Sequence, residues 1–147
     1  MWNLDYDSDM SNPGSEAWGL LFRLFVSQRG RVPQIAAEFD LSPMQAHVLR
    51  ILEPGMPVPM RAIAGKLRCD ASNITGIIDR LEERGLVQRA VLKSDRRVKM
   101  LVVTDRGITL RTHMLERLSE APEPIAQLSD EDQRVLCEIL HKAVEAS

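Results

Sequence analysis

Basic side chains gather in the middle of this 147-residue chain. Residues 61–99 include ten lysine or arginine residues and five acidic ones, so this segment has a charge of +5 in a chain whose formal net charge is −2. A basic middle between acidic ends is typical of a polyanion-binding module on an acidic scaffold. A solvated charged face is the alternative. The charge alone is compatible with both alternatives, and only the types and spacing of the surrounding residues can distinguish them.

Two groups of side chains in this basic segment are suited to contacts with DNA. Polar side chains near a helix N-terminus can reach base edges in the major groove, and guanidinium groups suit a narrow minor groove. The first group, on the polar faces of a helix predicted over about 71–84, is Ser72, Asn73, Thr75 and Arg80. The second group, in a polar loop between two β-rich runs, is Lys93, Asp95, Arg96 and Arg97, and Arg61 lies in the helix before. The alternative is that these side chains are only solvated.

The elements that carry these side chains follow one another as in a winged helix-turn-helix. A short helix over 60–67 precedes the helix over 71–84, for which Asp70 is a suitable N-cap and Gly85 a suitable end. The apolar stripe of that second helix is Ile74, Ile77, Ile78 and Leu81. The hydrophobic period then changes from 3.6 to 2 over 87–92 and 98–103, which predicts a β-hairpin.

Helices with apolar faces are predicted on both sides of this module. Apolar spacing predicts a first helix from Glu16 toward Phe39, interrupted or kinked at Pro33. Ser42-Pro43-Met44-Gln45 has the pattern of a capping box that starts the next helix. Two further helices are predicted, one from Thr104 to the prolines at 122 and 124, and one from Ser129 to about residue 144.

These flanking apolar faces exceed what one small module needs to cover itself. We therefore expect the segments near 18–25 and 125–144 to join two copies of the chain. The fold class predicted is mainly α with a small β-hairpin wing, as a single domain over 1–147. Its winged helix-turn-helix lobe would cover about 41–107, and its dimerisation helices about 14–40 and 108–147.

Six short motifs carry a family resemblance. They are Leu41-Ser42-Pro43-x-Gln45, Ile63-Ala64-x-x-Leu67, Asp70-x-Ser72-x-Ile74-Thr75, Asp79-Arg80-Leu81-Glu82-Glu83-Arg84-Gly85-Leu86-Val87, Asp95-x-Arg97 and Leu101-x-x-Thr104-x-x-Gly107. Together they resemble the MarR family of bacterial transcription regulators, over about residues 41–107. The string that runs from the second helix into the hairpin is the most specific of them.

The resemblance implies a sequence-specific regulator that binds double-stranded DNA as an obligate homodimer, with a winged helix-turn-helix lobe on each side. Many members of the family are repressors that small aromatic ligands or oxidation release from DNA. Matched by position, Arg97 would enter the minor groove and Asp95 would help to hold the wing. Such a guanidinium would suit the negative potential of that groove.

The chain departs from the family pattern at Gly76, where many relatives carry a larger and often basic residue. Glycine within a helix costs roughly 1 kcal/mol of helix propensity. Operator preference is therefore not carried over from relatives. Gly76 is also the one hint of an alternative function, a winged-helix protein-interaction or scaffold module without operator binding. Steep salt dependence of binding to duplex DNA would distinguish the two functions.

A ligand crevice between the dimerisation helices and the lobe is a further implication of the resemblance. The residues expected to line it are Trp18, Phe22, Met44, His47 and Met60. The alternative for each of them is an ordinary place in the core. Aromatic residues make up only 4% of the chain, so the pattern does not identify a small aromatic effector.

Other chemistry finds little support in the residue pattern. Cys137 and His141 share a helical face, but zinc usually takes at least three protein ligands. Catalytic dyads, triads and phosphate-binding glycine loops are also missing, so no enzyme, cofactor or metal is expected. Cys69 fits either a thiol sensor or a small buried hydrophobe. Two unpaired cysteines and the lack of a signal or membrane segment lead us to expect a cytoplasmic protein without a membrane partner.

Overall fold

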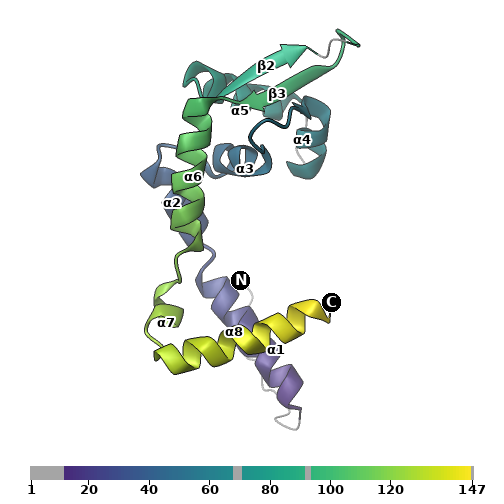
Figure 1. The fold of residues 1–147 in the computed structure, drawn as a ribbon. Coiled ribbons are helices and arrows are strands. Elements are labelled where there is room, and N and C mark those ends of the chain that lie inside the picture. The colour runs from purple at the N-terminus through teal and green to yellow at the C-terminus, as the bar shows by residue number, and fades with distance from the viewer. Residues whose placement is uncertain (1–11, 68–70, 92–93, 147) are drawn as a thin grey trace.

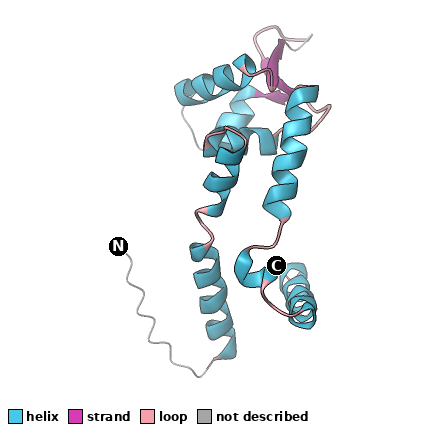
Figure 2. Cartoon of the chain, turned by 90° about the vertical axis from the view of Figure 1, so that its left-hand side faces the viewer, coloured by secondary structure: helices cyan, strands magenta, loops and turns pink. Residues whose placement is uncertain are grey.

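The computed structural model describes residues 12–67, 71–91 and 94–146. Its elements are α1 (Pro13–Ser27), α2 (Arg31–Glu38), α3 (Pro43–Ile51), β1 (Val58–Pro59), α4 (Met60–Leu67), α5 (Ala71–Glu83), β2 (Val87–Val91), β3 (Lys99–Val103), α6 (Asp105–Ser119), α7 (Glu123–Ala126) and α8 (Asp130–Glu145). The elements from α2 to α6 form the lobe at the top of Figure 1. Two arms extend below it, α1 from the start of α2, and α7 with α8 from the end of α6 (Figures 1 and 2).

The N-terminal helical segment breaks at a different place from the one predicted. The predicted interruption at Pro33 is wrong, because α1 ends at Ser27 and α2 begins at Arg31, with a turn at residues 28–30 between them. Pro33 is the third residue of α2, where a missing N–H costs no hydrogen bond, since the first four N–H groups of a helix lack intrahelical partners. Gly30, a poor helix former, lies in the break.

Local signals placed the start of α3 correctly. The Ser42 side chain accepts a hydrogen bond from the Gln45 N–H at 3.2 Å, and the Gln45 side chain accepts one from the Ser42 N–H at 2.8 Å. This reciprocal pair is the predicted capping box, with Pro43 in the first turn. Asp70, the predicted N-cap of α5, lies outside the described residues.

The helix-turn-helix and the wing have the predicted form. The stripe of α5 faces the core, with Ile74, Ile78 and Leu81 buried and Ile77 half-buried. Gly85 then takes a φ of +67°, a conformation that favours glycine after a helix. Strands β2 and β3 pair antiparallel in the register Val87↔Val103.

A third strand was not predicted. The sheet order is β1-β3-β2, with β1 antiparallel to β3 in the register Val58↔Leu101. This strand has two residues, one of them Pro59, so it is too short to show a period of 2. The four-residue helix α7, which begins directly after Pro122 and contains Pro124, was also missed, because it is too short to show a helical period.

The start of α6 is fixed to the end of α5 by Thr104 and Gly107. The Thr104 hydroxyl donates to the Gly85 carbonyl at 2.6 Å and accepts from the Gly107 N–H at 3.1 Å. The Thr104 N–H donates to the Leu86 carbonyl at 3.1 Å. A Cβ on Gly107 would lie 1.9 Å from that Leu86 oxygen, so only glycine allows this close approach.

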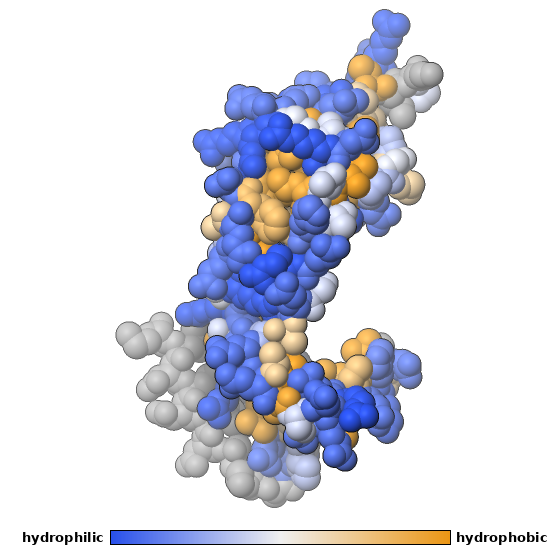
Figure 3. All heavy atoms as spheres, turned by 60° about the vertical axis from the view of Figure 1, so that its left-hand side comes forward, coloured by the Kyte–Doolittle hydropathy of each residue, from blue (hydrophilic) through white to orange (hydrophobic). Residues whose placement is uncertain are grey.

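The arms differ from the lobe in how they expose apolar side chains. Neither α1 nor α8 has a buried residue, and Figure 3 shows apolar residues at the surface of the lower part of the molecule. The large apolar side chains exposed on these two helices include Trp18, Leu20, Leu21, Phe22, Phe25, Val26, Val135, Ile139, Leu140 and Val144. Among the described residues, no helix is long and apolar enough to cross a membrane.

Candidate DNA-binding interface

A groove of about 320 Å³ lies where the start of α4, the first half of α5 and the start of β3 meet. Its lining residues are Pro59, Met60, Arg61, Ala64, Ile74, Thr75, Arg97, Val98 and Lys99. The groove brings together three of the predicted DNA-binding residues, Arg61, Thr75 and Arg97, which come from three different elements of the lobe. Lys99 joins them, although it was not among the predicted DNA-binding residues. Its charge was counted in the basic segment, but alternation along a strand does not show which residue borders a groove.

The other predicted DNA-binding residues do not line this groove: they are exposed elsewhere on the lobe or lie outside the described part of the chain. Asn73 and Arg80 are exposed on α5, and Arg96 is exposed in the turn beside Arg97. Lys93 lies outside the described residues, as does the side chain of Ser72.

Asp95 shapes the turn of the wing. Its carboxylate accepts a hydrogen bond from the Arg97 N–H at 2.9 Å, and its carbonyl accepts one from the Val98 N–H at 3.1 Å. The aspartate thus holds the backbone of the turn, as an Asx turn does. The Arg97 side chain is exposed and borders the groove.

Arg89 is engaged in ion pairs within the lobe, so its charge is not available to a bound polyanion. Its guanidinium donates to Asp79 at 2.5 Å and to Glu82, and its N–H donates to Glu82 at 3.0 Å. Partial burial lowers the pKa of Arg89, but the hydrogen bonds and charges of Asp79 and Glu82 outweigh it and hold the pKa above its ordinary value. Helix α5 is thereby tied to β2 of the wing.

Arg84 is engaged in a similar way. It donates to the carbonyls of Phe39 and Asp40, at 3.1 Å and 2.6 Å, where α2 ends. Cations at helix C-termini satisfy carbonyls that lack intrahelical partners. The positive charge available for a polyanion is therefore smaller than the residue count of the basic segment suggests, and three of the remaining cations, Arg61, Arg97 and Lys99, line the groove.

Gly76 borders open space. A Cβ at this position would meet nothing within 4 Å, and its φ is not in the left-handed region. Neither packing nor backbone conformation therefore requires glycine here. Because glycine has no side chain, the backbone of α5 is exposed at this position, directly after Thr75.

The residues expected in a ligand crevice lie in separate places. Trp18 and Phe22 line an apolar hollow formed by α1 alone, whereas Met60 lines the groove beside the wing. Met44 and His47 are half-buried on α3. Burial lowers the pKa of His47, and the charge of Arg50 lowers it further.

Among the described residues, the cysteine and histidine side chains form no candidate site for metal binding. Cys137 is a free, exposed thiol on α8, and Cys69 lies outside the described residues. Within the described part of the chain, no group of three or more His, Cys, Asp or Glu side chains could hold a metal ion.

Comparison with known proteins identifies the family. The family model described as "MarR family" matches residues 41–99. HTH-type transcriptional regulator MhqR of Bacillus subtilis (strain 168) is 30% identical over 124 residues, which cover 84% of this chain and 86% of that regulator. The chain belongs to the MarR family. This MarR-family protein is a DNA-binding transcription regulator, as predicted, and the relatives it matches are regulators rather than enzymes.

Solved structures confirm the MarR fold. The crystal structure of YusO from Bacillus subtilis has a TM-score of 0.71 and 25% identity, and covers 91% of this chain and 96% of its own. CouR from Rhodococcus jostii RHA1, solved bound to p-coumaroyl-CoA, has a TM-score of 0.62 and 28% identity, and covers 90% and 94%. The mainly α winged helix-turn-helix predicted from the pattern is therefore correct.

Proposed function

We propose that this chain is a homodimeric, ligand-responsive repressor whose contacts with DNA are centred on the groove between α4, α5 and the wing. The observation that carries the proposal is the meeting of Arg61, Thr75, Arg97 and Lys99 around that one groove. Three cations, one from α4 and two from the wing, meet at one surface and suit the phosphates of a duplex better than a dispersed, solvated charge does.

The side chains contact different parts of the duplex according to their positions on the lobe. The first half of α5 lies in the major groove, where Ser72, Asn73 and Thr75 read base edges. Arg97 enters the adjacent minor groove from a turn held by Asp95, while Arg61, Arg80, Lys93, Arg96 and Lys99 contact phosphates. Contacts to phosphates position the protein, and contacts to bases select the sequence.

A second copy of the chain covers the apolar faces of α1 and α8. Phe25 on α1 and Val144 on α8 expose 73% and 70% of their surface, and no residue of either helix is buried. Exposed apolar faces of this extent mark protein interfaces. Self-association also fits the two-fold symmetry of a palindromic operator, so α1 and α8 are the dimerisation helices within the predicted segments 14–40 and 108–147.

The operator is then a pseudo-palindrome. A two-fold dimer presents two copies of α5, and their half-sites lie about one helical turn, roughly 10 base pairs, apart. Because its partner is duplex DNA, we place the protein in the cytoplasm.

The effector is a small aromatic compound or a conjugate of one. Support comes from CouR, which was solved with p-coumaroyl-CoA and shares 28% identity and the fold with this chain. In the dimer, Trp18 and Phe22 of one arm approach the lobe, where Met44, His47 and Met60 complete the crevice. The ligand releases the repressor by binding the DNA-free arrangement more tightly.

Selection of bound sequences from a random pool of duplexes tests the function and the operator together. We expect a dyad-symmetric sequence, bound with an affinity that falls linearly with salt on logarithmic axes. Enriched sequences without dyad symmetry would contradict the two-fold dimer. Failure to bind any duplex at low salt would contradict the proposal and favour a protein-interaction module.

A further inference from the structure

Two stretches of chain connect the lobe with its arms, and they lie side by side. One is residues 28–30, between α1 and α2, and the other is residues 120–122, between α6 and α7 (Figure 2). A hollow of about 350 Å³ lies between them, lined by residues of both stretches, such as Gln28 and Glu120, and by Arg31 and Glu38 of α2 and Arg117 of α6. We call these two stretches the crossings.

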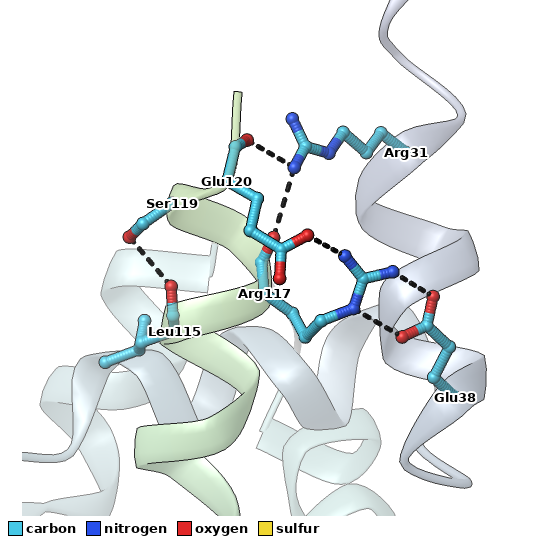
Figure 4. A network of polar contacts seen from close by, with 6 residues as sticks. All are labelled: Arg31, Glu38, Leu115, Arg117, Ser119 and Glu120. Atoms are coloured by element: carbon cyan, nitrogen blue, oxygen red, sulfur yellow. Dashed lines mark hydrogen bonds and ion pairs between the residues drawn. The ribbon is translucent and has the colours of Figure 1, made fainter. Parts of the chain in front are cut away.

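Arg117 is at the centre of a network between the crossings (Figure 4). Its Nη2 and Nε donate to the two carboxylate oxygens of Glu38 on α2 at 2.8 Å and 2.9 Å, and its Nη1 donates to Glu120. The hydrogen bond to Glu38 and the charges of Glu120 and Glu38 raise the pKa of Arg117 above its ordinary value. A bidentate arginine–carboxylate pair is directional, so it fixes an angle as well as a distance.

Arg31, the first residue of α2, adds a second tie. Its Nη2 donates to the carbonyl of Arg117 at 3.1 Å and to the carbonyl of Glu120. These carbonyls belong to the end of α6, where helical carbonyls lack intrahelical partners. The residue that follows the first crossing is therefore held to the residue that begins the second.

This network adds little to the packing of the lobe. The side chains of Arg117, Glu38 and Glu120 are 40%, 45% and 57% exposed, and exposed ion pairs contribute little stability. The buried residues Ile35 and Ala36 already pack α2 into the core. What the network adds is a fixed geometry at the two points where the arms leave the lobe.

We propose that the Arg117 network sets the separation of the two recognition helices in the dimer, and with it the half-site spacing that the protein selects. The inference rests on the proposed dimer and its binding of DNA. Helix α5 lies at the far end of the lobe from the crossings (Figure 1). A small rotation at the crossings therefore moves α5 by a larger distance, and Arg117 acts as a positioning residue without touching DNA.

A measurement without DNA tests this geometry directly. Spin labels on Glu83→Cys, at the exposed end of α5, report the distance between the two copies in a Cys69→Ser, Cys137→Ser background. We expect one narrow distance distribution in the parent and a broader or shifted one in Arg117→Gln. The matched control is Arg111→Gln, which removes an arginine of the same helix that donates to Leu49 and Arg50 within the lobe. Distributions that coincide in all three proteins would overturn the proposal.

A second measurement uses duplexes with two copies of the selected half-site, whose separation changes one base pair at a time. We expect Arg117→Gln to lose roughly 3- to 30-fold of the preference for the best spacing while its affinity for a single half-site stays unchanged. An unchanged spacing profile, or an equal loss on single half-sites, would overturn the positioning role. If melting shows that Arg117→Gln does not fold, Glu38→Gln takes its place, because it keeps the arginine and removes the charge of its bidentate partner. Failure of the proposed function is recognised separately, by a parent protein that neither dimerises nor binds.

Discussion

Gly107 shows how one residue can decide the junction between two helices. A Cβ there would lie 1.9 Å from the Leu86 oxygen and 2.7 Å from Val103 Cγ2. We expect Gly107→Ala to lower the free energy of unfolding by about 1–3 kcal/mol or more, because backbone has to move. Gly76→Ala, with open space around it, should raise that free energy by up to about 1 kcal/mol. Urea unfolding measures both, and equal effects would contradict the close approach.

Substitutions in the turn of the wing distinguish contact with DNA by Arg97 from a structural role. Arg97→Ala should weaken binding to every duplex and flatten the slope of log affinity against log salt by about 1, with an unchanged melting temperature, because the side chain is exposed. Asp95→Ala removes the acceptor of the Arg97 N–H and should disturb the turn itself. Titrations at several salt concentrations beside melting curves test this. Unchanged affinity and slope in Arg97→Ala would remove the wing from the binding mechanism.

His47 should make stability depend on pH. Burial and the charge of Arg50 lower its pKa, so the unfolded chain takes up the proton more readily than the folded one. The free energy of unfolding should therefore fall as the pH drops from neutral through the ordinary histidine value of 6.5. His47→Gln should lose this part of the pH dependence, and His113→Gln, exposed on α6, should keep it. Identical profiles for His47→Gln and the parent in urea unfolding would refute the assignment.

At the scale of elements, Arg89 joins the recognition helix to the wing. It pairs with Asp79 and Glu82 on α5 from its place in β2. We expect Arg89→Gln to lower the free energy of unfolding by about 1 kcal/mol and to weaken DNA binding, because the angle between α5 and the wing is no longer held. Arg106→Gln, an exposed arginine of α6, is the control and should change neither. Unaltered DNA affinity in Arg89→Gln would show that the wing keeps its angle without the pair.

At the scale of the whole molecule, the apolar arms predict a homodimer at micromolar concentration. Phe25→Asp places a charge on the exposed face of α1 and should shift sedimentation toward the monomer. Met56→Asp is the matched control, because Met56 is also exposed and apolar but lies in the loop after α3 on the lobe. A folded monomer in the unsubstituted protein would contradict the arrangement.

The sequence by itself determined what depends on neighbours along the chain. The capping box of Ser42 and Gln45, the stripe from Ile74 to Leu81 and the end of α5 at Gly85 each arise from residues within a few positions of one another, and β2 and β3 are neighbouring runs joined by one short loop. Their order was enough to predict the winged helix-turn-helix, and the six short motifs carried the resemblance to the family. It also placed Thr75 and Arg97 among the candidate contacts, since polar positions on a helix and in a turn follow from periodicity.

The tertiary structure alone decided which charges are free and which are engaged. Arg89 pairs across 7 and 10 positions, Arg84 across 44 and 45, and Arg117 reaches Glu38 across 79. Nothing in a local pattern distinguishes these arginines from Arg61 or Arg97, because each is a single cation at a polar position of a helix, strand or turn. The two-residue strand β1 likewise depends on a distant partner, the strand β3. Partners far apart along the chain are specified only when packing brings their elements together, and this is why the groove and the Arg117 network emerged from the fold.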